Sequence, residues 1–398
     1  MKKIYNAAII GCGAIGRAHI EGYQLLENIN LTAVVDPYEP ARKNYQDEYK
    51  IPYGFKNISD LQDIDIDIVS ICTPHLQHHQ NTIDVSMLGI KGIICEKPMT
   101  IGSGNASEMI NVTDQNNCKL IVSHQRRFTP GWIKAREIIK NGEIGSVSMI
   151  DIRVEQGLLN WATHTIDGAL FCLDDPYPLW VMGSLERNTD RYERDVRIED
   201  SCIGLVQLDN SSQLFIQSDL SNQEFTGFNN DAGYFSVIGT KGMINVSETE
   251  VLLFSKNTNG WKSIDLGIDE NNIKPIGGQT NADQIKELID WIEGGSEHRG
   301  SARKAKNTLD IMMSIYESAR INQKILFPVS QMNYPLDLMV EEKKLKIIKK
   351  GKYDIRGYLN RNNINEEKFT ELRKKGIDHH QIMVDLNTNS KKDISFNT

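Results

Sequence analysis

A glycine-rich turn near the N-terminus constrains the fold of this chain more than any other feature. The apolar residues 4–10 are typical of a buried strand, and residues 17–26 have the pattern of a helix. The G-x-G-x-x-G sequence between them therefore lies at a strand-to-helix turn, where glycines let the backbone approach a pyrophosphate closely. The free N–H groups at the helix N-terminus would bind that pyrophosphate. The residues expected to contact it are Gly11, Gly13, Ala14, Ile15 and Gly16.

An acidic residue after the second predicted strand predicts which dinucleotide binds. Asp36 follows the apolar residues 31–35 and comes twenty residues after Gly16. A carboxylate at this position accepts hydrogen bonds from the ribose hydroxyls of the cofactor and repels a 2′-phosphate. We therefore predict NAD as the cofactor, in preference to NADP.

The order of the remaining apolar segments predicts two kinds of sheet. Short apolar runs alternate with helical segments up to residue 124, which indicates a doubly wound parallel sheet. Beyond about residue 145, strand-like segments joined by short turns indicate antiparallel hairpins. The fold class is α/β, with an N-terminal parallel sheet and a C-terminal α+β domain built on a large open, mainly antiparallel sheet. The predicted domains are residues 1–124, residues 125–330 and a basic, partly disordered extension at 331–398.

Composition excludes several classes of partner. The net charge is −8 without a basic cluster, so we expect no nucleic-acid partner, and no apolar run is long enough for a membrane span. Six cysteines lack any C-x-x-C spacing, and the chain begins directly with a strand, so a reducing cytoplasm is expected. Residues 341–398 contain 14 Lys and Arg against 9 Asp and Glu. This segment either docks on its own protein or is simply solvated.

Two turns follow strands of the parallel sheet at the edge where such sheets bind ligands. One contains Thr73 and Pro74, and the other contains Glu96 and Lys97. A lysine beside a positively charged nicotinamide would have a lowered pKa and could share in the proton transfer of a substrate hydroxyl. A Lys-Pro pair alone is more typical of a surface turn.

The ordered set of motifs resembles the Gfo/Idh/MocA oxidoreductase family, over roughly residues 1–330. The motifs are the glycine turn, Thr73-Pro74-x-x-x-His78, Glu96-Lys97-Pro98 and Arg127-Phe128-x-Pro130. The resemblance implies that Lys97 is the catalytic lysine beside the nicotinamide. It also implies cofactor contacts from Thr73, Pro74, His78 and Glu96, and assembly into a homodimer or homotetramer through the C-terminal sheet.

A second catalytic segment is expected at residues 160–167. In the family this segment is D-x-x-x-H-x-x-D, and this chain retains His164 and Asp167 but has Asn160 at the first acidic position. An asparagine can hold a hydroxyl but cannot accept its proton. More of the acid–base work would then rest on Lys97 and His164. Asn160, Asp167 and Arg127 are predicted to contact the substrate, although Arg127 could equally form a buried ion pair.

These residues predict an NAD-dependent enzyme that oxidises a secondary hydroxyl of a sugar, a sugar derivative or a cyclitol. In this interpretation His164 accepts the hydroxyl proton, and Lys97 stabilises the developing alkoxide. No metal is expected, although His75, His78 and His79 have a spacing that could bind one. Two alternatives stay open. One is a redox-cycling enzyme that retains NAD and modifies a glycoside through a keto-sugar, and the other is a sugar-sensing regulator without catalysis.

Overall fold

The computed structural model describes residues 3–155, 157–219, 234–268 and 277–355, with a few single residues between 367 and 386. Most of the extension beyond residue 355 lies outside the described residues, so the partial disorder expected for residues 331–398 stays a prediction. No helix in the described part of the chain is both long enough and apolar enough to cross a membrane.

The N-terminal half contains a parallel sheet of six strands, which confirms the predicted doubly wound architecture. Strands β4 and β5, which both lie inside the sheet, are buried at every residue because helices cover both faces of the sheet. The outermost strand was not predicted, since it has only three residues and none of them is fully buried. Across the sheet the strands are β3 (Tyr53–Phe55), β2 (Ile29–Val35), β1 (Tyr5–Ile10), β4 (Ile68–Ile71), β5 (Gly92–Cys95) and β6 (Lys119–Val122).

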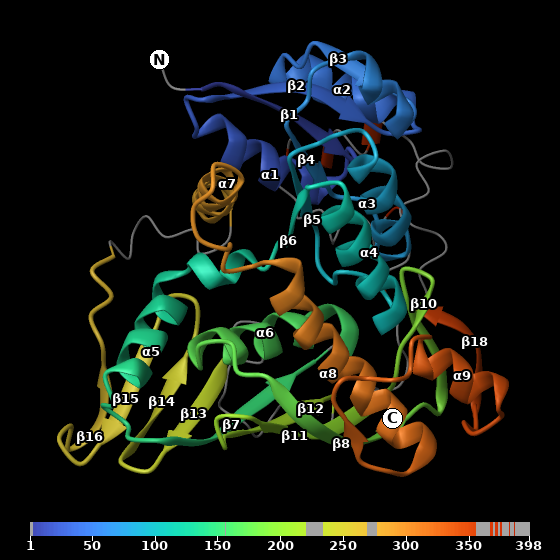
Figure 1. Cartoon of the computed structure of the whole chain (residues 1–398). Helices are drawn as coiled ribbons and strands as arrows, with labels where there is room; N and C mark the ends of the chain where they lie inside the picture. The colour runs from blue at the N-terminus through green and yellow to red at the C-terminus, as the bar shows by residue number, and fades with distance from the viewer. Residues whose placement is uncertain are drawn as a thin grey trace.

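Helices that connect these strands place every strand-to-helix turn at one edge of the sheet. This is the edge at which the predicted cofactor residues stand, as the alternation of strands and helices requires (Figure 1). The helices are α1 (Ala14–Gln24), α2 (Glu39–Tyr49), α3 (His78–Ser86) and α4 (Ser103–Gln115), with short 3₁₀ helices at Ile58–Asp63 and His75–Gln77.

The C-terminal half contains a nine-stranded sheet that is antiparallel except where β7 pairs with β12. The expected open and mainly antiparallel sheet is therefore confirmed. Alternating buried and partly exposed residues along β7 and β12 show that one face is packed and the other is not. In order, the strands are β16 (Gly260–Ser263), β15 (Val251–Ser255), β14 (Gly242–Val246), β13 (Phe235–Gly239), β7 (Val147–Val154), β12 (Gln213–Ser218), β11 (Ser201–Leu208), β8 (Pro178–Glu186) and β17 (Ile325–Leu326).

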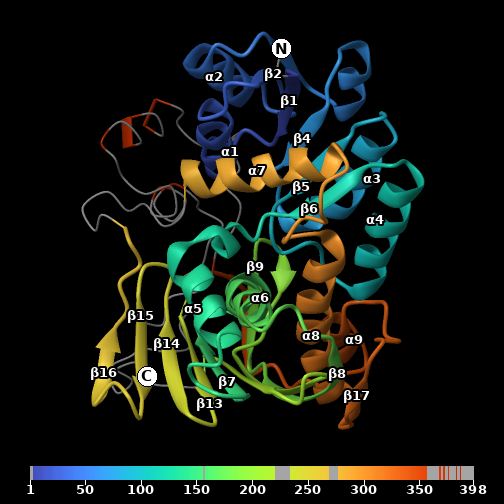
Figure 2. The same ribbon diagram turned by 60° about the vertical axis from the view of Figure 1, so that its left-hand side comes forward.

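Helices fill the space between the two sheets. Figure 2 shows α5 and α6 above the strands of the large sheet, and α8 beside them. Helix α7 packs against α1 of the N-terminal half, so that Asn281 lies against Gly22. The helices are α5 (Pro130–Lys140), α6 (Thr163–Cys172), α7 (Gly278–Ile292), α8 (Ala302–Ile321) and α9 (Pro335–Glu341), with short helical turns at Gln125–Phe128 and Leu158–Ala162.

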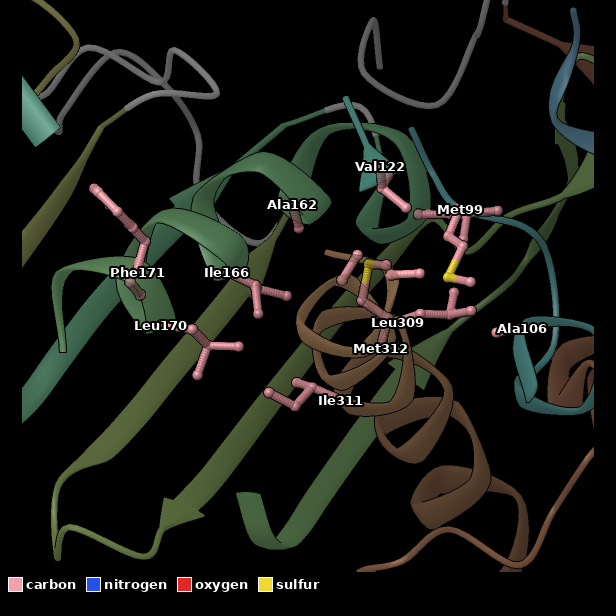
Figure 3. Packing of buried hydrophobic residues seen from close by; sticks show 14 of the residues in the cluster. Met99, Ala106, Val122, Ala162, Ile166, Leu170, Phe171, Leu309, Ile311 and Met312 are labelled. Atoms are coloured by element: carbon pink, nitrogen blue, oxygen red, sulfur yellow. The ribbon is translucent and has the colours of Figure 1, made fainter. Parts of the chain in front are cut away.

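One hydrophobic core runs through both halves of the chain. Ile166 of α6 and Met312 of α8 belong to the same buried cluster as Met99 and Ala106 of the N-terminal half (Figure 3). Because protein interiors are close-packed, this shared core holds the end of β5 at a fixed distance from the start of α6. The division of the chain into domains at residues 124 and 330 stays a prediction.

A small third sheet joins a hairpin of the C-terminal half to the basic extension. Its strands are β10 (Val196–Arg197), β9 (Thr189–Glu193) and β18 (Lys349–Asp354), and Figure 1 shows β10, β18 and α9 close together. Strand β18 pairs in parallel with β9, and Tyr334 donates a hydrogen bond to the carbonyl oxygen of Arg197. The described part of the extension therefore docks on its own protein.

Candidate active site

The glycine turn has the shape that a bound pyrophosphate requires. Gly11 has a φ of +97°, and a Cβ built there would lie 2.8 Å from the carbonyl oxygen of Cys72. A Cβ on Gly16 would lie 2.7 Å from the carbonyl oxygen of Gly11, whereas one on Gly13 would meet nothing within 4 Å. Helix α1 begins at Ala14 without a side-chain cap, so its first N–H groups are available to phosphate oxygens.

Asp36 lies directly beside this turn, at the carboxyl end of β2. Its carboxylate accepts hydrogen bonds from the backbone N–H groups of Cys12, at 2.9 Å, and Tyr38, at 2.8 Å. A carboxylate has lone pairs beyond those two, so it can also accept from ribose hydroxyls. The Arg42 guanidinium donates to the backbone carbonyl of Asp36 at 2.5 Å, which brings one cation close to the ribose position.

His78 ties the two other predicted cofactor turns together. Its Nε2 lies 2.8 Å from the carbonyl oxygen of Thr73, and its Nδ1 lies 2.8 Å from that of Pro98. Burial lowers the pKa of the His78 ring. Thr73 also accepts a hydrogen bond from Asn81 through its hydroxyl, at 2.9 Å. The turns after β4 and β5, including Pro74 and Lys97, are therefore held in one fixed arrangement.

Glu96 is buried below the sheet edge, and it pairs with a histidine that sequence reasoning did not identify. Its Oε1 lies 3.0 Å from Nε2 of His19, whose Nδ1 in turn lies 3.1 Å from the Ser70 hydroxyl. Burial acts to raise the pKa of Glu96, but the hydrogen bond and charge of His19 together with the charge of Lys97 lower it overall. Glu96 therefore anchors the turn that carries Lys97.

Lys97 meets the second predicted catalytic segment. Its Nζ donates to Oδ1 of Asn160 at 2.8 Å and to the Asn160 backbone carbonyl at 3.1 Å. Asn160 lies in the short π-helical turn Leu158–Ala162, a type of irregularity that is frequent at functional sites. Burial lowers the pKa of Lys97 to about 7; the charges of Arg194 and Arg126 also act to lower it.

His164 lies one turn further along, at the start of α6, and is buried. Burial lowers its pKa well below the usual value, and the positive charges of Arg126, Lys97 and His124 act in the same direction. The ring is therefore neutral near pH 7. Its centroid is 6.2 Å from that of His124, and its Nδ1 has no hydrogen-bond partner among the described residues.

Asp167 pairs with Arg127 and His124, and not with His164. Its two carboxylate oxygens accept from Nε and Nη2 of Arg127, each at 2.7 Å, and Oδ1 lies 3.1 Å from Nδ1 of His124. Arg127 is fully buried and pairs also with Asp175. Burial raises the pKa of Asp167, but the charges of Arg127 and His124 outweigh it and lower the pKa overall. The buried ion pair that the sequence left open for Arg127 is present, and a substrate contact from either residue stays a prediction.

The hairpin β9–β10 contributes two residues that the sequence did not suggest. Glu193, at the end of β9, accepts a hydrogen bond from Nδ2 of Asn160 at 2.6 Å. Arg194, in the turn that follows, lies 2.9 Å from Nε2 of His75 through its Nη1. The charges of Glu193 and Arg194 both act on the pKa of Lys97, in opposite directions. The hairpin therefore forms part of the wall around Lys97.

The three closely spaced histidines have separate partners. His75 contacts Arg194, His78 contacts two carbonyl oxygens, and His79 pairs with Glu108 at 2.9 Å. No group of three or more potential metal ligands occurs in the described ranges of the chain.

Two family models match the chain in sequence. The first is an oxidoreductase family with an NAD-binding Rossmann fold and matches residues 5–124, and the second is the C-terminal alpha/beta domain of the same family and matches residues 136–327. The first match agrees with the glycine turn and Asp36. NAD is therefore the dinucleotide that the N-terminal half binds.

The curated relatives include an uncharacterised oxidoreductase of Bacillus subtilis, which is 32% identical over 153 residues, or 38% of this chain and 45% of that protein. A myo-inositol 2-dehydrogenase of Thermotoga maritima is 25% identical over 264 residues, or 62% of this chain and 77% of that protein. The inositol 2-dehydrogenase of Rhizobium meliloti is 30% identical over 36% of this chain and 43% of its own length. The chain thus spans about half the length of most of the curated relatives it matches.

Solved structures share the fold over most of the chain. A levoglucosan dehydrogenase in complex with NADH and levoglucosan superimposes with a TM-score of 0.70 at 19% identity, over 82% of this chain and all of that one. An oxidoreductase from Agrobacterium radiobacter gives a TM-score of 0.68 at 17% identity, over 81% of this chain and 98% of that one. Both family models and the shared fold lead to one assignment: the chain belongs to the Gfo/Idh/MocA oxidoreductase family.

Proposed function

We propose that the protein is an NAD-dependent oxidoreductase that oxidises a secondary hydroxyl of a sugar, a sugar derivative or a cyclitol. The observation that carries this proposal is the position of Lys97, whose amine has a pKa of about 7 and lies at the carboxyl edge of the parallel sheet. A proton acceptor works best when its pKa is close to the working pH. Relatives named inositol and myo-inositol 2-dehydrogenase support the class of substrate.

The roles of the two catalytic candidates follow from their pKa values. A neutral His164 with a strongly lowered pKa is a weak base, so it serves as a hydrogen-bond partner of the reacting hydroxyl. Its Nδ1, which lacks a partner in the described part of the chain, is available for that bond. Lys97 takes the hydroxyl proton as its neutral amine, which exchanges the roles expected from the sequence. Bound NAD supplies the acceptor for the hydride that leaves the substrate carbon.

Turnover of candidate substrates tests the proposal directly. We expect at least one member of a panel of inositols, aldoses and uronic acids to produce NADH, followed by its absorbance. A substrate that is consumed without net NADH release would identify the redox-cycling alternative. Binding of a sugar without any chemical change, in the presence of NAD, would favour the regulator.

The outer face of the large sheet supports a second part of the proposal, assembly into a homodimer or homotetramer. Large apolar side chains are exposed across five strands of that sheet, and a second copy of the chain is the simplest cover for them. Light scattering at micromolar protein should give at least the dimer mass, and a monomer would contradict the proposal. The exposed side chains are Met182, Ile203, Ile238, Phe254 and Trp261.

The cysteines support the predicted cytoplasmic location. All six are free and buried, as expected for a reducing compartment, whereas an oxidising compartment would favour disulfides. Burial raises the pKa of Cys72 and Cys202, which keeps these thiols in their unreactive neutral form. Fractionation of the native host should place the protein with cytoplasmic markers.

A further inference from the structure

The acidic residue missing at position 160 has a substitute elsewhere in the fold. We propose that Glu193 is a positioning residue, which acts through the Asn160 amide to present a hydrogen-bond acceptor to Lys97. The proposal rests on the proposed function, since it assigns Glu193 to the same reaction. It adds a residue that neither the motifs nor the sequence reasoning identified.

Hydrogen-bond chemistry fixes the orientation of the Asn160 side chain. An ionised carboxylate can only accept hydrogen bonds, so Glu193 requires that the NH₂ of Asn160 point toward it. The Asn160 oxygen must then point the other way, where it accepts from Lys97 at 2.8 Å. Without Glu193 the amide is free to turn, and its NH₂ would then face the lysine amine, which is also a donor.

The charge of Glu193 acts on Lys97 as well. Four charged groups act on the pKa of Lys97 besides burial: Arg194 and Arg126 lower it, while Glu96 and Glu193 raise it. The lysine charge in turn lowers the pKa of His164, which lies close by. Glu96 already pairs with His19, and it is fixed below the turn. After the larger effect of Glu96, the charge of Glu193 offsets a further part of the lowering that burial and the two arginines cause.

Burial and contacts from the neighbouring strand β18 fix the position of Glu193. Glu193 is 1% exposed, at the last position of β9. The carboxylate of Asp354, at the end of β18, accepts from the backbone N–H groups of Arg194 at 3.0 Å and Asp195 at 2.8 Å. A carboxylate that is buried and held by a neighbouring strand is well placed to orient another side chain.

A charge swap across the pair tests the proposal. In Glu193→Gln the carboxylate becomes an amide that can donate or accept, so the orientation of Asn160 is no longer fixed. We expect kcat to fall about tenfold or more, with a smaller change in KM. In the double variant Asn160→Asp with Glu193→Gln, the carboxylate at position 160 accepts from Lys97, and the amide at position 193 donates to that carboxylate. This variant should recover activity to within about threefold of the parent protein.

A second measurement needs no substrate. The pH dependence of Lys97 acylation, followed by mass spectrometry in the NAD-bound protein, reports the lysine pKa directly. Glu193→Gln should lower that pKa, and the double variant should restore or raise it. Asp195→Asn, an exposed carboxylate on the same turn that pairs with Lys352, is the matched control and should change neither kcat nor the lysine pKa.

The outcomes separate this proposal from the proposed function. Unchanged kcat and unchanged lysine pKa in a folded Glu193→Gln protein would overturn the role of Glu193, as would equal losses in the single and double variants. If no sugar or cyclitol is oxidised, the proposed function fails, while the acylation profiles still decide whether Glu193 acts on Lys97. Should Glu193→Gln not fold, the double variant and Glu193→Asp supply the same comparison.

Discussion

The two sides of the candidate site differ in how far apart their residues lie along the chain. On the cofactor side, short motifs at successive turns contain almost everything: Gly11–Gly16, Asp36 and Lys97 each follow a strand of one sheet. On the substrate side, Asn160 is positioned by Glu193, and the turn after Glu193 is held by Asp354. The cofactor side thus depends on local geometry, whereas the substrate side depends on long-range contacts.

Replacement of Lys97 should have the largest effect, because this residue belongs to both sides. Lys97→Ala removes the group that takes the hydroxyl proton, and such groups typically contribute about 10²–10⁴ to a rate. We expect kcat to fall at least about a hundredfold while the affinity for NAD stays within a few-fold. The control is Lys91→Ala, a half-exposed lysine just before β5 that pairs with Asp67. Parent-like turnover in Lys97→Ala would refute the proposed mechanism.

The choice of cofactor should respond to a purely local change. Asp36→Asn removes the charge that repels a 2′-phosphate, and Arg42 already lies beside that position. We expect the parent protein to prefer NAD over NADP by at least about tenfold, or about 1.4 kcal/mol. The variant should lose most of that preference. Dissociation constants for both cofactors provide the measurement, with the exposed Asp47→Asn on α2 as a control, and equal affinities in the parent protein would contradict the role of Asp36.

On the substrate side a remote change should affect catalysis without affecting cofactor affinity. Asp354→Ala removes the acceptor for two backbone N–H groups in the turn after Glu193. We expect kcat to fall roughly three- to tenfold, since a loosened turn positions Asn160 less well. Asp337→Ala, which removes an ion pair with Arg197 in the same extension, should leave kcat nearly unchanged. A loss of NAD affinity in Asp354→Ala would show that the two sides are not independent.

The pH profile should give the smallest of these effects. Because the pKa of Lys97 is lowered to about 7, its neutral form predominates above that pH and is lost as the pH falls. The value of kcat/KM for oxidation should therefore be about half-maximal near pH 7 and should decrease further on acidification. A profile that is flat from about pH 6 to pH 8.5 would exclude Lys97 as the proton acceptor.

The difference between local motifs on the cofactor side and long-range contacts on the substrate side explains what the sequence could predict. The parallel sheet and its ligand edge follow from local patterns, and so does the position of Lys97. The hairpin does not, because residues 187–200 are so rich in charge that they resemble a solvated surface. Yet buried residues alternate along residues 187–193 with the period of a strand. The buried side chains are Arg187, Thr189, Arg191 and Glu193.

Asp167 shows a second limit of sequence reasoning. Its spacing from His164 indicates a shared helical face, and both residues do lie on α6. Spacing does not specify a partner, however. Arg127 comes from a segment forty residues earlier and occupies both carboxylate oxygens. Only the packing of α6 on that segment reveals this pair.

The two hydrogen bonds by which Asp354 clamps the turn after Glu193 can form only late in the synthesis of the chain. Asp354 follows Arg194 by 160 residues. At a translation rate of roughly 5–20 residues per second, the turn leaves the ribosome on the order of ten seconds before its clamp is made. A nascent chain can therefore complete the cofactor turn early, while the hairpin beside Lys97 must wait for β18.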